Sequence, residues 1–237
     1  MIITIDGPAA SGKSTVARRL ACELSCYYLY SGLLYRAMAY LLVKHYGYTR
    51  VQLEAPVEAH ICEILVSGRL CYTYTVELGA QVFFDGVDCT PLLKTREVDD
   101  IASISSTALV VREAVLHLQR TLARDYDLIA DGRDCGTVVF PEAHHKFFLM
   151  ASPQIRAQRW HRDQQRLGKQ LTFDEALAAV VERDERDTKR ALCPLVIPQG
   201  AFVVNNSDLT LEETVTLFRQ YCASEVLPPE QQDIQAL

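Results

Sequence analysis

The sequence predicts an α/β protein in which a five-stranded parallel sheet is flanked by helices. Short apolar runs rich in β-branched residues alternate along the chain with longer segments of helical periodicity. The 237-residue chain is 49% hydrophobic and 23% charged, which is the ordinary range for a globular protein. A glycine-rich turn follows the first apolar run and precedes a helical segment. In sheets of this kind the ligand site lies beyond the carboxyl ends of the strands.

The strands and helices can be placed in order along the chain. Apolar runs predict the five core strands, which are residues 2–5, 27–30, 127–132, 146–150 and 201–205. Apolar residues spaced three and four apart predict the helices, which are about 13–24, 33–46, 95–104, 109–125, 153–167, 173–191 and 211–224. Residues 72–76 and 81–84 flank Gly79, a pattern typical of short antiparallel strands. The tail at 228–232 is expected to fray.

Composition and charge exclude several classes of protein. No apolar stretch approaches the roughly 20 residues that a membrane span needs, and no basic segment precedes an apolar one at the N-terminus. The net charge of −6 argues against general nucleic-acid binding. None of the eight cysteines forms a Cys-x-x-Cys motif, so reduced thiols are expected rather than zinc ligands. We therefore expect a cytoplasmic monomer with no nucleic-acid or membrane partner.

Residues 7–14 read Gly-Pro-Ala-Ala-Ser-Gly-Lys-Ser and match the phosphate-binding loop G-x-x-x-x-G-K-[ST]. The motif follows a predicted strand and opens a predicted helix, which is the context it requires. Its glycines let backbone N–H groups surround a phosphate, and the helix N-terminus adds partial positive charge. Lys13 is expected to reach the outer phosphates, and the Ser14 hydroxyl to bind the Mg²⁺ that accompanies the nucleotide. The sequence therefore predicts the P-loop NTPase fold and a nucleoside triphosphate ligand.

The rest of the chain narrows the class of P-loop protein. The Asn-Lys-x-Asp motif that reads guanine is absent from the sequence, and the chain is short for a remodelling ATPase. Two polar segments follow core strands, Ser31–Arg36 after the second and Asp131–Asp134 after the third. Parallel strands bring these segments to the same edge of the sheet as the phosphate loop. The sequence favours a kinase that acts on a small acceptor.

The predicted helix 173–191 carries charges on what should be its inward face. Its apolar stripe starts at Phe173 and continues at helical spacing through Leu177, Val180, Arg183, Asp187 and Arg190. We expect these three charged residues to face a cleft. The alternative is an exposed lattice of ion pairs four residues apart, each of which stabilises a helix only slightly.

The preceding helix, 153–167, is strongly basic along one face. Its four arginines stand at spacings of three and four residues and are Arg156, Arg159, Arg162 and Arg166. A mobile lid that closes over a polyphosphate would need such a face. A plain surface helix is the alternative interpretation.

These residues together resemble the bacterial cytidylate kinases, a family of P-loop nucleoside-monophosphate kinases. The resemblance covers nearly the whole chain. Its most specific segments are Asp-Gly-Val-Asp-Cys-Thr at 85–90, Thr-Arg-Glu-Val at 95–98 and Asp-Gly-Arg-Asp-Cys-Gly-Thr at 131–137, with further matches at 5–8, 31–36, 111–113 and 182–187. The resemblance implies transfer of the γ-phosphoryl group from MgATP to CMP or dCMP, which gives CDP or dCDP and ADP.

The resemblance also implies residue roles at matching positions. Cytosine would be contacted by Ser31, Arg112 and Asp134, the ribose by Ser103, Arg183 and Asp187, and the acceptor phosphate by Arg36, Arg133 and Arg190, with Asp131 in the same CMP site. The ATP site would comprise Gly7, Pro8, Ala9, Ala10, Ser11, Gly12, Lys13, Ser14 and Thr15, together with Arg156 and Arg159. Lys13, Arg133, Arg183 and Arg190 would act in catalysis, with Mg²⁺ as the cofactor.

The family pattern further divides the single domain, residues 1–237. The core would be 1–32, 99–151 and 171–237, with a monophosphate-binding insertion that contains antiparallel strands at about 33–98 and a helical lid at about 152–170. Two positions depart from the pattern. Tyr30 stands where the family usually has an acid, and Lys94 stands where it often has arginine.

Two other functions stay open on the sequence alone. Another P-loop nucleoside-monophosphate or small-molecule kinase, such as an adenylate kinase, would share the phosphate loop, although the insertion and Asp134 count against it. A nucleotide-binding regulatory protein without turnover would not need Lys13 and Ser14 together with paired arginines. Product formation from a panel of nucleoside monophosphates distinguishes these functions.

Overall fold

The central sheet of the protein has five parallel strands in the order β2-β6-β1-β7-β8. A computed structural model describes residues 1–66, 68–166 and 168–224. Its core strands are β1 (Ile2–Asp6), β2 (Tyr27–Tyr30), β6 (Leu128–Gly132), β7 (His145–Met150) and β8 (Phe202–Asn205). The predicted parallel sheet is confirmed, with shifts of one residue at several strand ends. The tail 228–232 lies outside the described residues.

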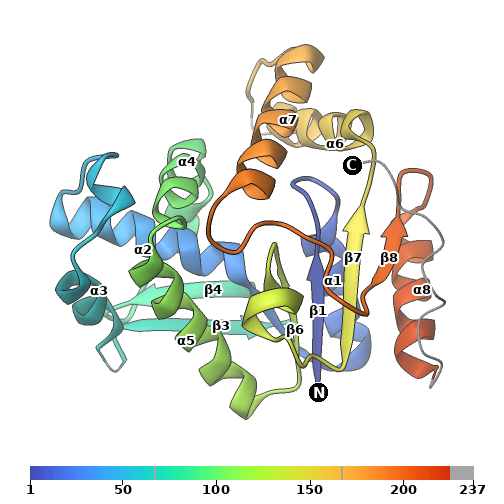
Figure 1. Cartoon of the computed structure of the whole chain (residues 1–237), viewed down its shortest axis with the longest axis horizontal. Helices are drawn as coiled ribbons and strands as arrows, with labels where there is room; N and C mark the ends of the chain where they lie inside the picture. Colours follow the sequence, from blue (N-terminus) through green and yellow to red (C-terminus); the bar gives the residue numbers. More distant parts are fainter. Residues whose placement is uncertain (67, 167, 225–237) are drawn as a thin grey trace.

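Helices cover both faces of this sheet (Figure 1). One face packs against α1 (Lys13–Leu24) and α8 (Leu211–Ala223), and the other against α2 (Ser31–Tyr46) and α5 (Leu109–Asp125). Successive residues of β6 alternate between the two layers, since Ile129 joins the α1 and α8 side while Leu128 and Ala130 join the other. Burial on both faces explains why the strands read as continuous apolar runs.

The carboxyl ends of β1, β7 and β8 point to the edge of the sheet beside which α6 (Pro153–Arg166) and α7 (Phe173–Lys189) lie (Figure 1). α7 begins with a capping box in which Thr172 and Glu175 each bond the other's backbone N–H. It ends before Arg190, so the predicted end at 191 is wrong. The Leu195 N–H donates to the carbonyl of Asp187 at 2.8 Å, which folds the chain back past the end of the helix.

The segment before α4 (Arg96–Ser105) contains most of the elements that the sequence left undefined. It includes η1 (Gln52–Glu54), α3 (Glu58–Leu65), β3 (Leu70–Thr75), β4 (Gly79–Phe84), β5 (Val87–Asp88) and η2 (Thr90–Leu93). The antiparallel pairing was predicted, but β3 and β4 each begin two residues earlier because Leu70 pairs with Phe84. The helix α3 was not predicted, because it buries only Ile61 and Ile64 and so has almost no periodicity.

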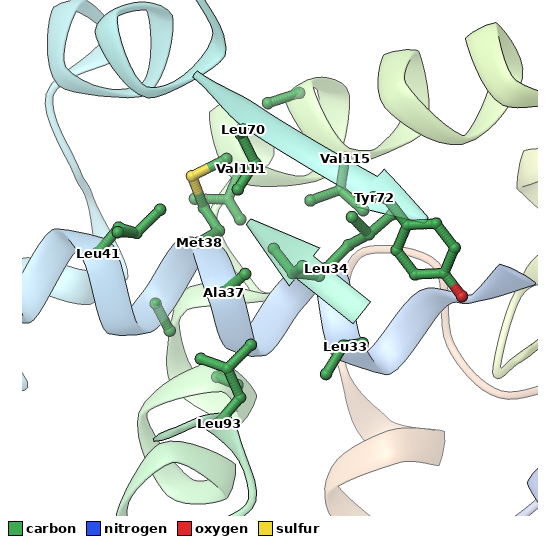
Figure 2. Close-up of a cluster of buried hydrophobic side chains, with 14 of the residues drawn as sticks. Leu33, Leu34, Ala37, Met38, Leu41, Leu70, Tyr72, Leu93, Val111 and Val115 are labelled. Carbon is green, nitrogen blue, oxygen red and sulfur yellow. The ribbon is translucent and has the colours of Figure 1, made fainter. Parts of the chain in front are cut away.

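One hydrophobic cluster joins this small sheet to the central one. Figure 2 shows Met38 of α2 lying beside Val111 of α5 and Leu70 of β3, and Leu34 of α2 lying nearer Val115 of α5 and Tyr72 of β3. The same cluster includes Leu128 of the central sheet, so the two sheets share a core through α2 and α5.

Two expectations from composition concern cysteines and membrane spans. All eight cysteines lie within the described residues and carry free thiols. Among the residues that the structure describes, no single helix is long and apolar enough to cross a membrane. By length and composition alone, α4 and α5 pass such a test together, but as a pair bent by 103°.

The shared core predicts a large difference between two leucine substitutions. Leu34 is 1% exposed, whereas Leu92 is 51% exposed. We expect Leu34→Ala to lower the free energy of unfolding by about 2–5 kcal/mol, because it leaves a cavity between α2 and the small sheet. The control Leu92→Ala should change it by less than about 0.5 kcal/mol. Urea unfolding followed by circular dichroism measures both, and equal effects would contradict the shared core.

Candidate active site

A cavity of about 460 Å³ opens at the carboxyl edge of the sheet. Its walls come from the phosphate loop, the ends of β2 and β6, and the helices α2, α4, α6 and α7. The predicted residues that line it are Ala9, Ala10, Gly12, Lys13, Ser14, Thr15, Ser31, Arg36, Ser103, Asp131, Arg133, Asp134, Arg159, Arg183, Asp187 and Arg190. The topology therefore gathers most of the predicted site residues around one cavity.

Five predicted residues lie outside the cavity wall: Gly7, Pro8, Ser11, Arg112 and Arg156. Gly7 lies where the phosphate loop passes close to the backbone of β7. A Cβ atom at this position would lie 2.1 Å from the carbonyl oxygen of Leu149, and its φ of +146° is one that side chains rarely permit. Only glycine lets the loop pass this close to β7.

Lys13 is folded onto its own loop. Its Nζ donates to the carbonyl of Pro8 at 2.6 Å and to the Ser11 hydroxyl at 3.3 Å. Burial and the positive charge of Arg133 lower the pKa of the Lys13 ammonium well below its usual range. The charges of Asp131 and Asp187 offset this effect only in part, so a bound polyphosphate would further stabilise the buried cation.

The carboxylates of Asp6 and Asp131 are buried under the loop. Asp6 accepts backbone N–H bonds from Cys135 at 2.8 Å and Gly136 at 2.7 Å, and burial raises its pKa to about 6. These two bonds turn the chain after β6. Asp131 Oδ2 accepts from the Tyr28 hydroxyl at 3.2 Å, while its Oδ1 is buried without a hydrogen-bond partner among the described residues. Burial also raises the pKa of Asp131.

The arginines of α6 do not all face the cavity, so the predicted four-arginine face is only partly correct. Arg156 is 4% exposed and donates to the carbonyl of Ala9 at 3.2 Å, while its Nη2 pairs with Asp184 of α7 at 2.6 Å. It is turned inward because these acceptors lie under the helix. Arg162 and Arg166 line the cavity as expected.

Arg159 connects α6 to the phosphate loop through Asn206. Its guanidinium donates to the carbonyl of Ser11 at 3.1 Å and to the Asn206 side chain at 3.0 Å. Asn206 in turn donates to the same Ser11 carbonyl at 3.0 Å. Asn206 was not predicted as a site residue, since an asparagine after a strand gives no distinctive pattern.

A buried network centred on Asp134 lies at the wall of the cavity. Arg112 Nη2 forms a short ion pair with its Oδ2, and Arg190 Nη2 lies 3.7 Å from its Oδ1. Arg112 Nε also donates to the Cys193 sulfur at 3.2 Å, and the guanidinium carbon of Arg112 lies 5.5 Å from the centroid of the Tyr35 ring. Asp134 and Arg112 are 5% and 6% exposed, so each is held by the other in a nearly dry setting.

A second group of charges that lines the cavity comprises Arg133, Asp187 and Arg183. Arg133 Nε donates to Asp187 at 2.7 Å, and although burial raises the pKa of this carboxyl, the guanidinium charge holds it below its usual range. Burial and the charge of Arg133 lower the pKa of Arg183. The predicted face of α7 does point into the cleft, while Phe173 is 37% exposed and does not continue the buried stripe.

Sequence reasoning also missed cavity residues whose positions only the fold reveals. Tyr35, Asp99 and Ser106 line the cavity, and Cys193 supports Arg112 from the segment after α7. Asp99 lies in the segment Arg-Glu-Val-Asp that begins α4, so a polar residue in a family-specific segment was the available signal. Cys193 had no such signal.

This fold and this cavity define a P-loop kinase, in which the phosphate loop and several arginines line one cavity. The family described as cytidylate kinase matches residues 3–224, and the chain belongs to that family. It is 39% identical to a cytidylate kinase of Thermodesulfovibrio yellowstonii over 91% of this chain and 95% of the relative. It is 38% identical to a cytidylate kinase of a Marinomonas species over 91% and 92%.

A solved structure shows the same fold at low sequence identity. The crystal structure of an uncharacterized protein from Eubacterium ventriosum matches with a TM-score of 0.52 and 11% identity, over 95% of this chain and 99% of that chain. This likeness concerns the fold alone.

The burial of Arg156 predicts a mainly structural effect when it is removed. We expect Arg156→Ala to lower the free energy of unfolding by about 2–3 kcal/mol, because Asp184 and two backbone carbonyls lose their donor. Arg166→Ala is the matched control, since Arg166 is 73% exposed and its pair with Asp163 contributes less than about 0.5 kcal/mol. Thermal and urea unfolding compare the two, and an Arg156→Ala protein as stable as Arg166→Ala would refute this account.

Proposed function

We propose that this protein transfers the γ-phosphoryl group of ATP to CMP or dCMP and releases ADP with CDP or dCDP. The observation that carries the proposal is the buried pair of Arg112 and Asp134, in which Asp134 lines the cavity and Arg112 holds it from just outside the wall. A carboxylate beside a guanidinium offers an acceptor and donors in one plane. Cytosine presents the complementary pattern, with an N4 amino donor next to the N3 and O2 acceptors.

Asp134 would accept a hydrogen bond from the cytosine amino group, and Arg112 would donate to N3 and O2. Uracil presents an acceptor at position 4 and an N–H at position 3, so both contacts would be mismatched. The Ser31 hydroxyl adds a polar group at the same edge, although it donates to the Asp131 carbonyl at 2.6 Å in this structure. The ribose would lie against Ser103, Arg183 and Asp187, which line the cavity between the base site and the loop.

The acceptor phosphate would be held by Arg36, Arg133 and Arg190, all of which line the cavity. Its second pKa is about 6, so an anionic oxygen is available at neutral pH and no general base is required. The main task is to bring two polyanions into line and offset their repulsion. Together with Arg183 and Lys13, these arginines supply that charge.

The ATP phosphates would lie in the loop of residues 7–15, next to Arg156 and Arg159. The backbone N–H groups at the start of α1 would donate to the phosphate oxygens, and Lys13 would exchange its bonds to Pro8 and Ser11 for the outer phosphates. Arg162 and Arg166 would approach the same anion as α6 closes over it, which would exclude water from the transfer.

The residues at the loop fit a magnesium ion brought in with ATP. Ser14 and Asp131 both line the cavity, and the buried Oδ1 of Asp131 lacks a hydrogen-bond partner among the described residues. A hydroxyl and a carboxylate are the hard oxygen donors that Mg²⁺ prefers. When bound, the ion would offset negative charge on the outer phosphates. We propose further that the enzyme works as a cytoplasmic monomer.

The proposed reaction is tested by a coupled ADP-release assay with MgATP and CMP, dCMP, UMP, AMP or GMP as acceptor. We expect CMP and dCMP to be used well and the purine nucleotides poorly. Lys13→Ala should reduce turnover by at least about two orders of magnitude, because the charge on the transferred group is no longer offset. Lys44→Ala, at an exposed lysine near the end of α2, is the control. Preferred use of AMP would favour an adenylate kinase, and no turnover with any acceptor would favour a regulatory nucleotide-binding protein.

Asp134 should determine the preference for cytosine over uracil. Two mismatched contacts at about 1–3 kcal/mol each predict a CMP/UMP ratio of kcat/KM of about 100 or more. Asp134→Ala should lower kcat/KM for CMP and reduce that ratio. Asp134→Asn keeps the shape of the side chain but can turn a donor toward the base, so it should reduce the ratio further. An unchanged ratio in both variants would mean that the base is recognised elsewhere.

A further inference from the structure

Tyr30 lines the cavity at the end of β2, and the proposed mechanism gives it no role. Its hydroxyl accepts a hydrogen bond from Arg36 Nη1 at 2.5 Å. On the other side of the same guanidinium, Arg36 Nε donates to Asp99 Oδ1 of α4 at 2.5 Å. Arg36 is therefore held between two acceptors that come from different elements.

These two bonds determine the orientation of the guanidinium plane. A single bond through Nε would leave the group free to tilt, whereas bonds at Nε and Nη1 fix two of its three nitrogens. Among the described residues, none accepts a hydrogen bond from Nη2. The fixed plane thus keeps donors free for an anion in the cavity, which Arg36 lines with only 15% of its side chain exposed.

The tyrosine ring is itself held on several sides. It stacks on Tyr28 with ring centroids 6.3 Å apart and an interplanar angle of 9°. It also packs so closely on Gly32 that a Cβ atom there would lie 2.9 Å from Cε2 of the ring. The backbone N–H of Tyr30 donates to the Tyr72 hydroxyl at 2.8 Å, which fixes the end of β2. These contacts of the ring and backbone hold the Tyr30 hydroxyl in place beside Arg36.

Repulsion among the arginines explains why such a support is needed. Arg36 lies close enough to Arg183 for its positive charge to lower the pKa of that neighbour, after the larger effects of burial and of Arg133. The guanidinium groups of Arg36, Arg133 and Arg183, which line the cavity with other arginines, favour conformations in which they point apart. Two acceptors that hold Arg36 oppose this movement before an anion arrives.

We propose that Tyr30 is a positioning residue for the acceptor phosphate, whose hydroxyl holds the Arg36 guanidinium with Nη2 free to bind that phosphate. This inference rests on the proposed function, in which Arg36 contacts the phosphate of CMP. It assigns Tyr30 to the acceptor side alone. The ATP phosphates and the cytosine ring should not be affected by the loss of the hydroxyl.

The test replaces Tyr30 by phenylalanine, which removes one oxygen and keeps the stacked ring. We expect the KM for CMP to rise about 10-fold, because the orientation of a charge-assisted contact is lost. The KM for ATP, and the inhibition constant of cytidine as a competitor of CMP, should each change less than twofold, since cytidine has no phosphate. Tyr27→Phe is the matched control, because Tyr27 stands on the same strand but does not line the cavity. The hydroxyl that this substitution removes donates to the Tyr72 carbonyl at 3.3 Å.

A second pair of variants separates positioning from a general weakening of the site. In an Arg36→Lys background, Tyr30→Phe should change the KM for CMP less than twofold, because the guanidinium that it positions is gone. A KM for CMP that stays unchanged in Tyr30→Phe overturns the proposal, as does an equal rise for ATP or for cytidine, or an equal rise in the Arg36→Lys background. These failures leave the proposed function intact if the wild-type protein and Tyr27→Phe phosphorylate CMP. A wild-type protein that does not use CMP overturns both.

Discussion

The site depends on keeping several positive charges close together in a cavity with little access to water. Lys13, Arg36, Arg133 and Arg183 gather at the edge of the sheet where the carboxyl ends of the strands lie, Arg133 directly after β6 and the others on helices. Without counter-charges, such a group would repel itself and destabilise the fold. Asp99 and Asp187 supply those counter-charges from helices that begin far from the strands in sequence. These carboxylates therefore stabilise the cluster of positive charges in the absence of any ligand.

Other buried ion pairs of the site connect elements that are far apart in the sequence. Arg112 on α5 pairs with Asp134 after β6, and Arg156 on α6 pairs with Asp184 on α7. Each pair crosses between segments that are 22 or more residues apart in sequence. Binding groups and structural supports are therefore made from the same residue types. A substrate that displaces one partner must replace its charge, which links occupancy of the site to the placement of the surrounding helices.

The central sheet and the phosphate loop could be predicted from the sequence, because both depend on short local patterns. An apolar run bounded by turns defines a buried strand, and the loop of residues 7–14 has a fixed spacing. The cleft-facing charges of α7 were also predictable, since helical periodicity extends beyond the apolar stripe. What could not be read locally was the direction of long side chains. Arg156 shares its spacing with Arg159 and Arg162, yet it turns under the helix toward Asp184, an acceptor supplied 28 residues later.

Residues that support another residue were the hardest to predict, because their partners come from distant segments of the chain. Asn206 and Cys193 touch arginines that come from other elements, and nothing in their own sequence neighbourhood indicates it. The short helix α3 escaped prediction because two buried isoleucines do not make a periodic pattern. Local propensity describes elements, whereas the supports of a site are set by tertiary contacts.

The hydrophobic cluster that joins the two sheets limits how this chain could be dissected or could have evolved. Leu128 and Ala130 of the central sheet share that cluster with Leu34 of α2 and Val82 of β4. A shortened protein without the small sheet and its neighbouring helices would expose one whole face of β6 to water. The small sheet is therefore no interchangeable module, and its sequence cannot drift independently of the core. An exchange of the segment as a unit would therefore have to preserve the side chains of this shared interior.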